Sequence, residues 1–192
     1  MVPVVFEKIH SGLFAVSRVA VWIGGLALLL SAFMVTADVL SRKVFGVTMS
    51  GSDEITGYVF AAATTWSYAY CLFSRANIRI DALYNLTSLK VRAALDLLGI
   101  VLLFFYIVLL TRNALGMYLD NLEFDSTAQT TLATPLWIPQ TFWLSGLFFF
   151  ALCLGFVLLY MCACLLRRDW QQVRKIAGIR SVEEEISDET HA

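Results

Sequence analysis

The chain has 192 residues, of which 59% are hydrophobic and only 15% are charged, and its formal net charge is −1. Its mean hydropathy is +0.73, whereas an ordinary soluble domain has about 25% charged and ~45–50% apolar residues. This composition excludes a typical soluble protein and indicates a membrane protein. The net charge near zero gives no reason to expect a nucleic-acid partner.

The N-terminal segment, residues 1–18, has the pattern of an amphipathic helix. Its apolar residues fall on one helical face: Phe6, Ile9, Leu13 and Val16. Glu7, Ser11 and Arg18 fall on the opposite face. Such a helix is expected to lie in the membrane interface, with its apolar face in contact with phospholipids.

Residues 19–166 are predicted to form an all-α membrane domain. A helix that crosses ~30 Å of hydrocarbon needs about 20 mostly apolar residues. Four stretches meet this requirement, at about 19–39, 55–73, 95–119 and 136–166. A second interfacial amphipathic helix is predicted at about 81–93, and residues 167–192 form a polar cytoplasmic tail. The fold class is therefore four transmembrane helices plus two interfacial helices.

Lysine and arginine residues near the ends of the spans predict the orientation. They concentrate in the N-terminal segment, in the loop between the second and third spans, and after the fourth span. The loop between the third and fourth spans, "DNLEFDSTAQTTLAT", contains three acids and no base. Because cytoplasmic loops carry the excess of basic residues, both termini are predicted to be cytoplasmic.

Ionisable residues near or inside the spans are the first candidate functional residues. They are Asp38, Glu54 and Arg112, which lie in the outer half of the bilayer by this topology. Arg42, in the loop after the first span, is a further candidate for an interface. A pair between Arg112 and one of the acids would reduce the cost of removing these charges from water. Three interpretations are open: a structural clasp between helices, a contact with another membrane subunit, or a coupling charge for ion transport.

Further candidates are interface residues. Gly57 and Ala61 recur at a four-residue spacing that allows another helix to approach closely. Trp137 and Pro139 open the fourth span, where tryptophan is typical of the membrane interface. Arg79 and Asp81 lie in "ANIRIDAL", which we interpret as a cytoplasmic corner between the second span and an interfacial helix.

The sequence contains no pattern that predicts catalysis. The four cysteines have no metal-binding or redox spacing, and the two histidines lie near the chain ends. We therefore expect no catalytic residues, no metal site and no cofactor, and the chain is predicted not to be an enzyme.

Three motifs together resemble a known family. "GSDEITGYVFAAATTW", "RANIRIDAL" and "STAQTTLATPLWIPQTFW" occur in this order over roughly residues 15–166. The chain resembles the small membrane subunit of tripartite ATP-independent periplasmic (TRAP) transporters, the dicarboxylate-type small permease family. Glu54, the pair Arg79 and Asp81, and the pair Trp137 and Pro139 match the family pattern. Asn77 departs from it, because the family usually has histidine there.

The resemblance implies a function. Such a subunit is a scaffold in a bacterial inner membrane, where it supports a large multi-span subunit during sodium-coupled import of an organic acid such as a C4-dicarboxylate. A periplasmic substrate-binding protein delivers the solute, and the solute itself is not identified by this chain. The alternative is a stand-alone homo-oligomeric transporter or channel that uses Glu54, Asp38 or Arg112. A membrane redox enzyme is disfavoured by the lack of histidine ligands.

Overall fold

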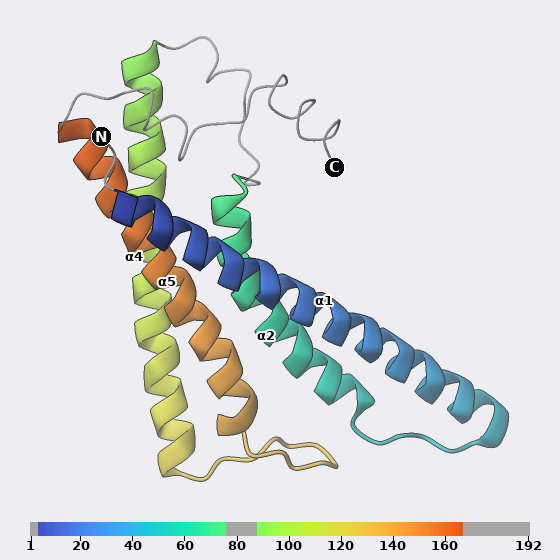
Figure 1. The fold of residues 1–192 in the computed structure, drawn as a ribbon. Helices are drawn as coiled ribbons and strands as arrows, with labels where there is room; N and C mark the ends of the chain where they lie inside the picture. Colours follow the sequence, from blue (N-terminus) through green and yellow to red (C-terminus); the bar gives the residue numbers. More distant parts are fainter. Residues whose placement is uncertain (1–3, 76–87, 167–192) are drawn as a thin grey trace, which may run out of the picture. The chain divides into compact units, whose positions relative to one another are not determined.

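The computed structural model describes residues 4–75 and 88–166, and these residues form four helices (Figure 1). The helices are α1 (Val4–Phe45), α2 (Ser52–Phe73), α4 (Leu89–Glu123) and α5 (Trp137–Leu166). Within this part of the chain, the β-type pairing is limited to one isolated bridge between Thr127 and Pro135. The all-α prediction is confirmed for the described residues.

Three of the four helices are long and apolar enough to cross a membrane. The qualifying segments are Phe6–Phe45, Val91–Glu123 and Trp137–Leu166. Helix α2 has 22 residues, which is about 33 Å of helix, but its many serine, threonine and tyrosine side chains make it less apolar. The predicted span at 55–73 lies inside α2, and its crossing of the membrane remains a prediction.

Helix α1 is continuous over 42 residues. The described part of the predicted interfacial segment, residues 4–18, therefore joins the predicted span 19–39 without a break in the helix. Of the predicted interfacial helix 81–93, residues 81–87 lie outside the described residues and residues 89–93 belong to α4. The tail 167–192 also lies outside them, and the proposed domain boundaries remain predictions.

The contacts divide the chain into two compact units. The first consists of Met1–Tyr70 and Ile107–Ala151, and the second consists of Cys71–Tyr106 and Leu152–Ala192. Helices α4 and α5 each contribute one part to the first unit and one part to the second, so each unit is considered by itself below.

In the first unit, α1 and α2 approach closely because small residues face each other. A Cβ atom placed on Gly24 would lie 3.1 Å from the Cβ atom of Ala63. Toward the start of α1, the rings of Phe14 and Tyr70 stack with a centroid distance of 5.7 Å. Small side chains at a helix crossing permit this close backbone approach and the dispersion contacts that accompany it.

Helix α2 also packs on α5 within the first unit. The indole Nε1 of Trp66 donates a hydrogen bond of 3.1 Å to the carbonyl oxygen of Phe142. The Trp66 ring also stacks on that of Phe149 at 5.3 Å between centroids. A Cβ atom on Gly146 would collide with Thr65 and Trp66, so glycine is required for this packing.

The first-unit parts of α4 and α5 share an apolar cluster. Its buried members are Ala114, Leu144 and Leu147, against which Leu110, Tyr118 and Trp143 pack. A hydrogen bond of 3.2 Å from Nδ2 of Asn121 to Oε1 of Gln140 joins the same two helices near their connecting loop. Polar pairing near the loop and apolar packing within the helices suit a membrane boundary at this level.

The second unit has its own apolar interior. Its fully buried side chains include Cys153, Leu154 and Met161 of α5. The side chain of Ile100 in α4 is almost fully buried. A Cβ atom on Gly155 would lie 3.4 Å from the Phe104 ring, which is ordinary van der Waals contact. The cysteines are free thiols, and Cys153 serves as a small apolar residue in this interior.

Hydroxyl groups inside the helices bond to the backbone of their own helix. Ser31 donates to the carbonyl of Ala27 at 2.9 Å, and Thr111 donates to that of Ile107 at 2.7 Å. Ser17, Thr36, Thr64, Thr65 and Ser67 do the same. Because lipid offers no hydrogen-bond partners, these bonds allow polar residues to occur within membrane helices.

Candidate functional site

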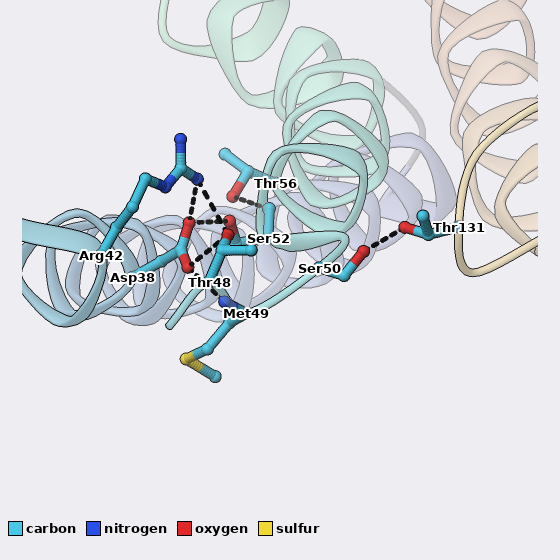
Figure 2. Close-up of polar contacts among 8 residues, drawn as sticks. All are labelled: Asp38, Arg42, Thr48, Met49, Ser50, Ser52, Thr56 and Thr131. Atoms are coloured by element: carbon cyan, nitrogen blue, oxygen red, sulfur yellow. Dashed lines mark hydrogen bonds and ion pairs between the residues drawn. The ribbon is translucent and has the colours of Figure 1, made fainter. Parts of the chain in front are cut away.

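The strongest polar arrangement surrounds the carboxylate of Asp38, which is only 1% exposed. Asp38 lies in α1, two turns before the end of the helix. We call the residues that bind it the Asp38 cluster: Asp38, Arg42, Thr48, Met49 and Ser52 (Figure 2).

The donors of the Asp38 cluster come from three places. Nη2 of Arg42, one helical turn further along α1, lies 2.7 Å from Oδ2 of Asp38. The backbone N–H of Met49 and the hydroxyl of Thr48 donate to Oδ1 from the turn after α1. The hydroxyl of Ser52, the first residue of α2, donates to Oδ2 at 3.1 Å.

The carboxylate therefore connects the end of α1, the following turn and the start of α2. A negative group at a helix N-terminus is favourable because the free backbone N–H groups there carry partial positive charge. The arrangement holds the α1–α2 turn in one conformation.

Glu54 forms a second polar contact, with the loop that precedes α5. The hydroxyl of Tyr58 donates to Oε1 of Glu54 at 2.7 Å, and the hydroxyl of Thr130 donates to Oε2. These hydrogen bonds, from Thr130 first and then Tyr58, lower the pKa of Glu54 below its usual value. They do so because they stabilise the ionised form, so Glu54 is an anion at neutral pH.

The loop before α5 is itself ordered by backbone hydrogen bonds. Ala128 donates to the carbonyl of Thr134 at 2.9 Å, and Leu136 donates to that of Ser126 at 3.0 Å. The tip between them reaches the α1–α2 turn, where the hydroxyls of Ser50 and Thr131 share a hydrogen bond (Figure 2). We call this contact and the bond between Thr130 and Glu54 the loop contact.

Gly51 is required where the two loops meet. Its φ angle is +99°, which side chains other than glycine rarely adopt, and a Cβ atom there would collide with Leu132. We expect Gly51→Ala to lower the free energy of unfolding by about 1–3 kcal/mol, measured by denaturation of the purified chain.

Gly57→Ala provides the matched control for this substitution. Gly57 is helical, and a Cβ atom there would meet nothing within 4 Å. Since alanine favours a helix over glycine by about 1 kcal/mol, the control is expected to be equally or more stable. Equal stability of Gly51→Ala and the wild type would contradict the role assigned to Gly51.

The structure brings together some of the predicted site residues. Asp38 and Arg42 form an ion pair, and Glu54 lies two residues after Ser52, which binds Asp38. Arg112 is exposed on α4, and the described residues show no ion pair between it and either acid. The partner of Asp38 is thus Arg42, at the i, i+4 spacing that brings helical side chains together.

The remaining predicted residues have separate surroundings. Gly57 is exposed and Ala61 is half-buried on α2. Trp137 begins α5 and is 38% exposed, and Pro139 lies in the first turn without interrupting the helix. Arg79 and Asp81 lie outside the described residues.

A comparison with protein families gives the context of this site. The family model described as "Tripartite ATP-independent periplasmic transporters, DctQ component" matches residues 30–168. The chain belongs to this family. Comparison with curated proteins and with solved structures gave no significant match.

As a DctQ component, the chain is a small permease subunit of a tripartite transporter system and belongs to a family of transporter components rather than enzymes. The matched residues include the Asp38 cluster and the loop contact. The resemblance seen in the sequence is confirmed.

Proposed function

We propose that this DctQ component is the scaffold subunit of its transporter. It supports the large multi-span membrane subunit, which carries out sodium-coupled import of an organic acid such as a C4-dicarboxylate. A periplasmic substrate-binding protein delivers the solute to the complex. The complex lies in the bacterial inner membrane, and both termini of this chain face the cytoplasm.

The proposal rests on the hydrogen bonds and the burial of the Asp38 carboxylate. The carboxylate accepts hydrogen bonds from four groups of the same unit and is buried by them. A coupling charge must bind and release an ion during transport, which requires an accessible group. A carboxylate that is saturated by fixed donors instead favours a structural role.

The direct test compares uptake with and without the partners. Uptake of radiolabelled dicarboxylate is expected only when the chain is co-reconstituted with its large subunit and supplied with the binding protein. It is also expected to require a sodium gradient. Robust uptake by liposomes that contain only this chain would favour the stand-alone transporter and overturn the proposal.

Neutral isosteres distinguish the two functions residue by residue. For Asp38→Asn, Glu54→Gln and Arg112→Gln, uptake is divided by the amount of assembled complex in the same vesicles. If the subunit is a scaffold, uptake per assembled complex is expected to stay near the wild-type value. Any loss of total uptake then follows from a loss of assembly. A normal amount of complex with uptake reduced more than about tenfold would indicate a coupling charge.

The exposed face of α2 is a candidate contact with the large subunit. Gly57 offers open space for a neighbouring helix, since glycine permits close approach. We expect Gly57→Trp to reduce co-purification of the large subunit about tenfold or more.

Gly25→Trp on α1 is the control, because Gly25 is exposed and equally open. It is expected to preserve co-purification. Equal co-purification of both variants with the wild type would remove Gly57 from the interface.

A further inference from the structure

The first unit contains an apolar groove that neither the Asp38 cluster nor the loop contact uses. It has a volume of about 610 Å³ and is bounded by α1, α2, the start of α5 and the loop before α5. Its lining includes Val16, Ala20 and Ala27 of α1, Tyr58 and Trp66 of α2, and Phe142 of α5. All of these residues belong to the same unit.

The body of the groove is a hydrocarbon surface. The hydroxyl of Tyr58 is bonded to Glu54, and the indole N–H of Trp66 is bonded to the Phe142 carbonyl. The polar groups of these side chains are therefore occupied. An occupant needs to be apolar along most of its length.

The length of the groove is that of about one membrane leaflet. The lining extends from Tyr58 to Trp66 on α2 and from Val16 to Ala27 on α1, which correspond to about 12 Å and 16 Å of helix. Half of the hydrocarbon core measures about 15 Å.

One end of the groove lies at the membrane surface. Thr134, which lines the groove next to Tyr58, belongs to the non-helical loop before α5. Irregular backbone is excluded from lipid-exposed positions within the hydrocarbon, so this loop marks the surface. The groove therefore has a mouth at the head-group level and an apolar body below it.

The mouth carries negative charge. Glu54 is bonded to Tyr58 at this end. The described residues show no ion pair of Glu54 with a basic side chain, so its charge is not neutralised there. Such a mouth attracts an ammonium group and repels an anionic head group.

We propose that this groove binds a phospholipid whose head group carries a primary ammonium, with an acyl chain between α1, α2 and α5 and the ammonium beside Glu54. This binding goes beyond the scaffold role and does not require transport. It would make the lipid a fixed part of the subunit.

Lipid retention by the full-length chain tests the proposal. The chain is purified in mild detergent with equal amounts of phosphatidylethanolamine and phosphatidylglycerol, and bound lipid is counted by native mass spectrometry. We expect preferential retention of phosphatidylethanolamine. Ala20→Trp fills the groove and is expected to reduce retention at least about fivefold.

Two further variants make the test specific. Ala32→Trp changes an exposed alanine of α1 outside the groove, and it is expected to retain lipid like the wild type. Glu54→Gln keeps the side-chain shape and is expected to lower the preference for phosphatidylethanolamine about two- to fivefold, the range of a partly exposed charge pair. Equal retention by Ala20→Trp and the wild type, or equal loss in both tryptophan variants, would overturn the proposal.

Fluorescence provides a measurement that does not depend on the folding of Ala20→Trp. In a chain that keeps Trp66 and has phenylalanine at the other four tryptophan positions, brominated phosphatidylethanolamine is expected to quench more strongly than brominated phosphatidylglycerol. Equal quenching would overturn the head-group assignment. Loss of the large subunit from Ala20→Trp with lipid retained would show that a protein helix occupies the groove, and would also overturn the proposal.

Discussion

Replacement of Asp38 by alanine is expected to lower the midpoint of thermal unfolding by about 5–10 °C. The substitution leaves the Met49 N–H and the Ser52 hydroxyl without their acceptor. Ser52 is only 4% exposed, so water does not easily replace the lost bond. The measurement is thermal denaturation of the purified chain, followed by circular dichroism.

Arg42→Ala is the control that separates the hydrogen bonds from the ion pair. The Arg42 side chain is 58% exposed, and exposed ion pairs contribute little because water solvates both charges. We expect a decrease of only about 1–2 °C. A decrease for Arg42→Ala as large as that for Asp38→Ala would show that the ion pair, and not the closure of the turn, stabilises this end of the helices.

Leucine in place of Gly24 is expected to destabilise the first unit by about 1–3 kcal/mol or more. The Cβ atom alone would lie 3.3 Å from the Cα atom of Ala63, so the backbones of α1 and α2 must move apart to admit a larger side chain. The separation removes dispersion contacts along the helix crossing. The measurement is denaturant unfolding in detergent.

Gly25→Leu, one residue further on, is the matched control. A Cβ atom at Gly25 would meet nothing within 4 Å, and the residue is exposed. The expected stability is that of the wild type or slightly higher, since leucine favours a helix more than glycine does. Similar losses of stability in both variants would show that replacing glycine by leucine destabilises α1 at either position. The loss in Gly24→Leu could then not be assigned to the packing of α1 on α2.

The helices were largely predictable because they depend on local sequence. Long apolar stretches identify spans whatever their neighbours are. The predicted span at 95–119 lies within α4, and the predicted span at 136–166 begins one residue before α5 and ends with it. The pair of Asp38 and Arg42 could also have been read from their four-residue spacing. The expectation of a pair between Arg112 and one of the acids rests on the cost of a charge inside a span.

The contacts between loops were not predictable from the same rules. Thr130 and Glu54 are separated by 76 positions in the chain, and no periodicity links a loop residue to the start of a distant helix. Ser50 and Thr131 are separated by 81 positions. Gly51, which precedes Asp53 and Glu54, is the one local signal of these contacts. Glycine is the usual residue where the backbone has a positive φ or approaches another segment closely.

The length of α1 has a consequence for how the chain lies in the membrane. Its 42 residues extend about 63 Å, roughly twice the ~30 Å hydrocarbon core, and tilts of up to about 40° do not absorb that difference. A helix of this length therefore extends beyond the hydrocarbon core at one end or at both. Because α1 has no break along its length, a displacement of the part outside the core by any bound molecule is transmitted as a rotation or tilt of the membrane-embedded part.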